Sequence, residues 1–327
     1  MSTDTTSFQT VLDTLTAPGR DFPRRYLQHF SDMGDLELKT LQDVWTRVAP
    51  SRKLTLLDAL QSLAEEDTLV NFDDFARAVI HDPDPQVRIR VIRLLHECED
   101  AKLASTFLDL LKKDADIHVR VEAANALGLF VDLGELEEIS ESIYRRIEDT
   151  LLAVANSDDD ARVRRAALES LGYSARPEVA TLIESSLHRE DPAWQASALV
   201  AMGRSADERW EDDVLRALAH VNDNVRRAAV QAAGELELKS TRPALLKMLG
   251  EEEDDRVMSA VIWSLSQIGG EDARTYLENL LDQTEDDEQI AYLEDALDNL
   301  SFTEDLERFD LFAFDPDADL EDPDDEE

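Results

Sequence analysis

Two stretches of the chain, DARVRRAALESLG at residues 160–172 and NDNVRRAAVQAAG at residues 222–234, share one pattern. Each begins with Asp or Asn, has a valine three residues later, continues through arginine and alanine, and ends in glycine. The valine position recurs at steps of 32, 44, 31, 31, 32 and 32 residues, in the column Val87, Val119, Val163, Trp194, Val225, Val257 and Gln289. Self-similarity with a period of about 30 residues indicates a solenoid of stacked repeats.

The start of each repeat carries a helix N-cap. Short polar residues lie three positions before the valine column, at Asp84, Asp116, Asp160, Asp191, Asn222, Asp254 and Asp286. Their side chains accept hydrogen bonds from the free N–H groups of a first helical turn, and a carboxylate suits the positive end of the helix dipole. Pro85 and Pro192 follow two of these caps at the first helical position, where a missing N–H costs nothing. We therefore expect a helix to begin at each cap.

Small apolar residues follow the valine column at offsets of four and eight, which trace one face of a helix. The next column reads Gly128, Gly172, Gly203 and Gly234, and we expect these glycines to end the first helix of each unit. A leucine 24 residues after the valine column marks a second helix, at Leu111, Leu187, Leu218, Leu249 and Leu281. Neither helix buries its apolar stripe alone, so the units must stack. The predicted fold is all-α, an α-solenoid or superhelix of helix pairs.

The order Asp, two variable residues, Val, Arg, alanines and Leu-Gly resembles the HEAT repeat, an armadillo-like helix pair. The short form found here is similar to the repeats of bacterial phycobilisome-lyase HEAT domains. The resemblance covers about residues 82–300. It implies a solenoid whose concave surface is lined by the second helices, of a kind that has no assigned activity.

Composition and period divide the chain into four parts. We expect residues 1–22 to be disordered or weakly ordered, and residues 23–82 to form an N-terminal cap and a degenerate first repeat. Residues 83–300 are predicted to form a solenoid of about seven repeats, with a loop insertion near residues 131–142. The acidic residues 301–327 are predicted to be a disordered C-terminal tail.

The position after the valine column holds a row of arginines, Arg88, Arg120, Arg164 and Arg226, with Gln195 and Met258 between and after them. One interpretation is an anion-binding row. The resemblance instead implies that these arginines pair with turn aspartates, namely Asp82, Asp114, Asp158, Asp159 and Asp223, because arginine paired to carboxylate satisfies both groups.

Two sets of residues are candidates for partner binding. By the resemblance, the concave face would carry the residues 22 positions after the valine column, Asp109, Ser185, Arg216, Lys247 and Asn279. The second set is the aromatic cluster Phe309, Leu311, Phe312 and Phe314 in acidic surroundings. This cluster either folds over the open end of the last repeat or forms a linear motif that docks into a partner.

Charge limits the partners. The net charge is −41, and residues 284–327 contain 20 acidic residues and one arginine. Phosphate backbones and anionic membranes repel such a surface, so we expect a protein partner, for which basic proteins or segments are the natural candidates, and neither nucleic acid nor membrane. Since only 7 of the 33 basic residues are lysine, the acidity has an equally weighted alternative explanation in the salt or genome composition of the host.

Catalytic and metal-binding signals are weak. The six histidines are scattered without an i, i+4 pair, and the run from His96 to Glu99 contains adjacent residues that point in different directions.

The single cysteine, Cys98, and the lack of a secretory signal favour a cytoplasmic protein. We predict a non-catalytic interaction scaffold or adaptor without cofactor or metal. The alternatives are a phycobilin-lyase-like or metal-dependent enzyme subunit, and an acidic decoy of a DNA-binding protein.

Overall fold

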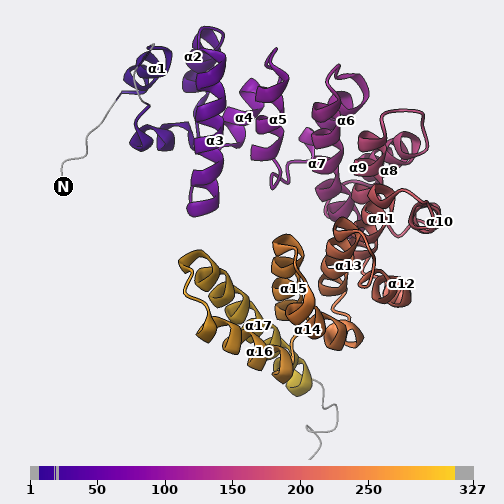
Figure 1. Ribbon diagram of the computed structural model, residues 1–327. Coiled ribbons are helices and arrows are strands. Elements are labelled where there is room, and N and C mark those ends of the chain that lie inside the picture. Colours follow the sequence, from indigo (N-terminus) through magenta and orange to yellow (C-terminus); the bar gives the residue numbers. More distant parts are fainter. Residues whose placement is uncertain (1–6, 18, 20–21, 314–327) are drawn as a thin grey trace, which may run out of the picture. The chain divides into compact units, whose positions relative to one another are not determined.

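The computed structural model describes residues 7–17, 19 and 22–313, and over these residues it contains helices and turns without a β-strand (Figure 1). The chain divides after Val179 into two compact units. We describe each unit by itself.

The first unit is a series of helices connected by short turns. Its elements are α1 (Phe8–Thr16), η1 (Arg24–Phe30), α2 (Asp35–Trp45), α3 (Pro50–Glu66), α4 (Asp73–Val79), α5 (Pro85–Leu94), α6 (Lys102–Lys113), α7 (Ile117–Glu135), α8 (Glu141–Ala155) and α9 (Ala161–Leu171). Helices α3, α5, α7 and α9 contact one another in that order, while α6 and α8 lie against α7 and α9. Helix α10 (Pro177–Leu187) crosses the boundary of the units.

The second unit repeats the same plan. Its elements are α11 (Pro192–Arg204), η2 (Glu208–Trp210), α12 (Glu211–Ala217), α13 (Asp223–Glu235), η3 (Lys239–Thr241), α14 (Arg242–Glu251), α15 (Asp255–Ile268), α16 (Glu271–Gln283) and α17 (Asp287–Ala313). Helices α11, α13, α15 and α17 contact one another in series, and α12, α14 and α16 pack against α13, α15 and α17 respectively. This stacking of helix pairs confirms the predicted α-solenoid fold.

The predicted N-caps are confirmed. The side chains of Asp84, Asp116, Asp160, Asp191, Asn222 and Asp254 each accept a hydrogen bond from a backbone N–H of the helix that follows. Pro85 and Pro192 occupy the first position of α5 and α11. The helix starts are therefore fixed by short-range interactions that the sequence encodes locally.

The predicted role of the glycine column is wrong in most repeats. Gly172 does end α9, but Gly128, Gly203 and Gly234 lie inside α7, α11 and α13. A Cβ at Gly234 would lie 2.9 Å from Ser264 Oγ and 3.0 Å from Ser264 Cα on the next first helix. The hydroxyl of Ser264 also donates to the carbonyl of Val230, at 2.8 Å. Glycine is needed here because it lets neighbouring first helices approach closely.

Substituting Gly234 with alanine is expected to lower the free energy of unfolding by about 1–3 kcal/mol, because the added methyl group overpacks the contact between α13 and α15. Gly250 is a matched control in α14, since a Cβ there would meet no atom closer than Tyr276 Oη at 3.8 Å. Gly250→Ala is expected to stabilise by up to about 1 kcal/mol through helix propensity alone. Thermal unfolding of both variants measures the difference, and equal shifts would contradict the close-packing role.

The insertion near residues 131–142 is not a loop over most of its length. Instead α7 continues to Glu135, and the chain turns only before α8. A Cβ at Gly134 would lie 2.1 Å from Tyr144 Cδ2, so glycine makes room for the Tyr144 ring. The Tyr144 hydroxyl lies 2.5 Å from Glu135 Oε1 and 2.9 Å from Glu148 Oε1. This network holds the lengthened helix against α8.

Glu148 is the buried centre of that network. Its Oε1 atom also accepts a hydrogen bond of 2.5 Å from the Ser174 hydroxyl, and its side chain is fully buried. Burial, together with the two neighbouring carboxylates, raises the pKa of Tyr144. The Tyr144 hydroxyl therefore stays protonated, and Glu148 links it to Ser174 in the segment after α9.

The ends of the solenoid differ from the predicted boundaries. Helix α1 buries Val11, Leu12 and Leu15, so residues 8–16 are ordered by packing, whereas residues 1–6 lie outside the described residues. At the other end α17 runs to residue 313, which moves the boundary predicted at residue 300. Residues 314–327, the larger part of the predicted tail, also lie outside the described residues.

Candidate functional site

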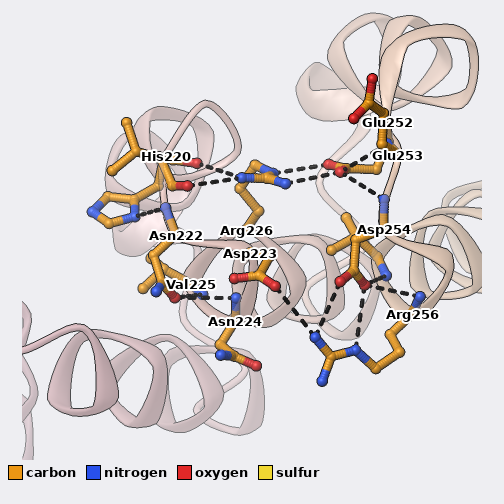
Figure 2. Close-up of polar contacts among 12 residues, drawn as sticks. His220, Asn222, Asp223, Asn224, Val225, Arg226, Glu252, Glu253, Asp254 and Arg256 are labelled. Carbon is orange, nitrogen blue, oxygen red and sulfur yellow. Dashed lines mark hydrogen bonds and ion pairs between the residues drawn. The ribbon is translucent and has the colours of Figure 1, made fainter.

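The turn before α13 is held by Arg226 (Figure 2). The Arg226 Nη1 group donates to the carbonyls of His220, at 3.0 Å, and Val221, at 3.3 Å. The Asn222 side chain caps α13 by accepting from the N–H groups of Asn224 and Val225. The chain before α13 is therefore fixed, with Val221 at its outer edge.

The other side of Arg226 binds Glu252, directly after α14. Nε and Nη2 of Arg226 donate to the two carboxylate oxygens of Glu252, each at 2.8 Å. Glu252 Oε1 also accepts from the backbone N–H groups of Glu253, at 3.1 Å, and Asp254, at 3.2 Å. Hydrogen bonding to Arg226 lowers the pKa of Glu252, and the same contact raises the pKa of Arg226. This bidentate pair joins two successive repeat turns (Figure 2).

The same arrangement recurs in the first unit. Arg88 binds both carboxylate oxygens of Asp114 at 2.8 and 2.7 Å, and Arg120 binds Asp159 at 2.7 Å. Each also donates to a turn carbonyl six residues before it, as Arg226 does. The predicted arginine–aspartate pairing is thus confirmed for Arg88 and Arg120.

One repeat departs from the prediction. Arg226 pairs with Glu252 and not with Asp223, whose carboxylate lies 3.3 Å from Arg256. Arg164 donates to the carbonyl of Ala155 at 3.1 Å. Since carboxylates and carbonyls of the chain occupy these guanidinium groups, the arginine column joins neighbouring repeats.

Substituting Glu252 with glutamine is expected to lower the free energy of unfolding by about 1–2 kcal/mol at pH 7, because a charge-assisted pair becomes a neutral contact. The folded-state pKa of Glu252 is lowered, so its contribution is complete above its ordinary value of 4.5 and is lost as the pH falls through the folded-state pKa. Unfolding in denaturant between pH 7 and 3 should show the two proteins converging below pH 4.5. Glu253→Gln, the same substitution at the exposed neighbouring position, is the control.

A groove of about 770 Å³ lies between α12 and α14, beside the Arg226–Glu252 pair. Apolar side chains of both helices and of the turn after α12 line it, namely Leu215, Leu218, Ala219, Val221, Ala244 and Met248. The carboxylates of Asp223, Glu251, Glu252, Glu253 and Asp254 line it as well. We call this set of residues the α12–α14 groove.

The predicted concave-face residues are all exposed on second helices, and each makes a contact within its own helix. Lys247 lines the α12–α14 groove and pairs with Glu251 at 3.4 Å. Arg216, on α12, forms an ion pair with Asp213 in its own helix. The remaining three make local contacts: Asp109 accepts from Lys113, Ser185 donates to the Leu182 carbonyl, and Asn279 donates to the Thr275 carbonyl.

Sequence reasoning missed the apolar members of the groove. Val221 directly precedes the cap Asn222, at a position held by Pro83, Ala115, Asp159, Glu190, Glu253 and Glu285 in the other repeats. The available signal in the sequence was a β-branched apolar residue at a turn position where the other repeats have proline, alanine or an acidic residue. The structure leaves it 94% exposed.

The first unit has a groove at the corresponding place, between α6 and α8, with a volume of about 960 Å³. Its charged residues include Lys112, Arg145, Arg146 and Asp149. With Asp158 and Asp159, which also line it, this groove has three charged residues of each sign, whereas in the α12–α14 groove five carboxylates outnumber Arg226 and Lys247.

The structure describes the candidate tail motif only in part. Phe309, Leu311 and Phe312 lie on the stretch of α17 where the structure describes the backbone alone. Phe314 lies outside the described residues. The motif therefore stays a prediction.

The run from His96 to Glu99 lies in the turn and loop that follow α5. Cys98 is buried, its Sγ atom accepts from Arg77 at 3.1 Å, and burial raises its thiol pKa. Within the described part of the chain, no group of three or more His, Cys, Asp or Glu side chains is arranged to hold a metal ion. No helix in residues 7–17 or 22–313 is long and apolar enough to cross a membrane.

Comparison with known proteins identifies the repeats. Residues 73–142 and 211–298 match the family model of HEAT repeats. No curated protein matches the sequence.

Solved structures with similar folds are distant in sequence. The complex of CpcE and CpcF of phycocyanin lyase from Nostoc sp. PCC7120 matches with 19% identity over 70% of this chain and 94% of that chain, at a TM-score of 0.46. Human deoxyhypusine hydroxylase matches with 16% identity over 80% and 95%, at 0.35. A structure of Kap95 with Nup1 matches with 12% identity over 90% of this chain and 46% of that chain, at 0.44.

Proposed function

Since HEAT repeats occupy residues 73–142 and 211–298, we propose that this chain is a non-catalytic scaffold that binds a partner protein in the α12–α14 groove. The partner would present a segment that combines apolar and basic side chains. The observation that carries the proposal is a groove in which exposed apolar side chains lie beside five carboxylates.

The apolar part of the groove supplies affinity. Val221 is 94% exposed and Leu215 is 39% exposed, although both line a concave surface. Fully burying a side chain of this size is worth about 1.5–3 kcal/mol relative to leaving it in water. A partner side chain that covers Val221 would therefore recover free energy that the isolated chain does not gain.

The charged part of the groove supplies selectivity. Its cations are already paired, Arg226 with Glu252 and Lys247 with Glu251, and Arg256 nearby pairs with Asp223 and Asp254, so five carboxylates face three cations. The excess is negative, so lysine or arginine on a partner is favoured and acidic partners are repelled. Exposed charges are screened by salt, so the rate of association should fall as the ionic strength rises.

The repeat-to-repeat pairs keep the groove in shape. Arg226 ties the turn after α12 to the residue after α14, which are the two sides of the groove. Because the groove is held before the partner arrives, binding avoids part of the cost of ordering loops.

A matched pair of substitutions tests the proposal. Val221→Glu places a charge among the groove residues, and Leu69→Glu is the control, since Leu69 is 88% exposed and lies in the first unit. Both variants are immobilised and compared with the unchanged chain for the proteins they retain from an extract of the host cell, at physiological and at high salt. We expect Val221→Glu to lose the partner and Leu69→Glu to keep it. Retention of the same proteins by both variants at both salts would contradict the proposal.

A further inference from the structure

Helix α17 is anchored on two sides. Its residues Leu293, Ala296 and Leu300 are fully buried. The Asn299 side chain donates to Ser266 Oγ of α15 at 2.9 Å, and Arg274 of α16 binds Glu304 at 2.8 Å. These contacts hold α17 rigidly up to its fifth turn.

The side of α17 opposite its buried residues carries apolar side chains. Phe302 is 64% exposed and Leu306 is 51% exposed, and a spacing of four residues places them on one helical face. The α17 backbone continues to residue 313, so the helical path from Phe302 extends for about 18 Å. A monomer gains nothing from a phenylalanine that is left mostly in water.

Acidic residues extend the same face toward the N-terminus of α17. Asp295 and Asp298 precede Phe302 by seven and four residues, and both are exposed, as is Asp305 beside the apolar pair. Across residues 284–327 there are 20 acidic residues and one arginine. Two copies of this face would bring like charges together, which disfavours self-association.

We propose that Asp295, Asp298, Phe302 and Leu306 form a second docking surface, which binds a basic amphipathic helix of another protein. Apolar residues of that helix would cover Phe302 and Leu306, and its lysines or arginines would meet Asp295 and Asp298. The surface belongs to α17 and the α12–α14 groove to other helices, so either site can fail without the other.

The probe is an 18-residue fluorescein-labelled peptide of leucine and lysine, with leucines spaced three and four residues apart. Its comparison peptide has the same composition in an order that forms no apolar face. Fluorescence anisotropy at physiological salt measures binding to the full chain, to the double variant Phe302→Ser/Leu306→Ser, and to the control Leu36→Ser/Leu69→Ser, which changes exposed leucines of the first unit.

We expect the Phe302→Ser/Leu306→Ser variant to bind the amphipathic peptide at least about tenfold more weakly, which corresponds to about 1.4 kcal/mol. The Leu36→Ser/Leu69→Ser variant should bind it as the unchanged chain does. Equal binding by the double variant would overturn the proposal, because attraction between the acidic chain and any lysine-rich peptide would then suffice. So would a dimer of the unchanged chain in sedimentation that Phe302→Ser/Leu306→Ser dissociates, because the occupant would then be a second copy.

Discussion

Asp82→Ala is expected to destabilise the first unit by about 3–5 kcal/mol, because it leaves a buried ammonium group without its carboxylate. Asp82 and Lys53 are both buried, and Lys53 Nζ lies 2.5 Å from Asp82 Oδ2. The same oxygen accepts from the indole N–H of Trp45 at 2.7 Å, while Oδ1 accepts from the N–H of Asp84 at 2.9 Å. One side chain thus connects α2 and α3 to the cap of α5.

Two further variants separate the charge from the hydrogen bonds. Asp82→Asn keeps an acceptor for Trp45 but removes the negative charge, so its cost should fall below that of Asp82→Ala. Adding Lys53→Met to Asp82→Asn removes the unpaired ammonium group and should recover part of the loss. Denaturant unfolding followed by tryptophan fluorescence measures all three. A cost below about 1 kcal/mol for Asp82→Ala would contradict the anchoring role.

Phe107→Ala is expected to cost about 3–5 kcal/mol, since it opens a cavity in the core between α6 and α7. Phe107 is fully buried, and its ring centroid lies 6.2 Å from that of Phe130, which is also fully buried. In a solenoid each repeat contacts only its neighbours. A cavity at one interface therefore weakens the stabilising interaction between the repeats on its two sides.

The matched control for Phe107→Ala is Phe302→Ala, the same substitution on the exposed face of α17. It should change the midpoint of thermal unfolding by little, because surface substitutions usually stay within about 0.5 kcal/mol. Similar losses for the two variants, measured by thermal unfolding, would show that Phe302 is covered in solution.

The parts of the fold that the sequence predicted are those with local causes. An N-cap such as Asp84 or Asn222 acts on N–H groups two or three residues away, so its pattern is readable in the sequence. The arginine pairs were predicted through the resemblance, and two of them form with the expected aspartates.

The parts that the sequence did not predict depend on contacts between distant residues. Gly234 acts through Ser264, and the lengthened α7 depends on the Tyr144 ring over Gly134. At the candidate site, the residues chosen 22 positions after the valine column included Lys247 but not Val221. Only the fold brings the turn after α12 next to α14. Nothing in the local pattern of α17 indicated that it would continue past residue 300.

The most direct test of the proposed function is site-specific photo-crosslinking in the host-cell extract. A photoreactive residue is placed at Val221 in one version of the chain and at Leu69 in another, since both positions are mostly exposed. The account predicts a crosslink from position 221, through a lysine- or arginine-rich segment of one protein, and no crosslink to that protein from position 69. The same products from both positions, or none from position 221, would contradict binding in the α12–α14 groove.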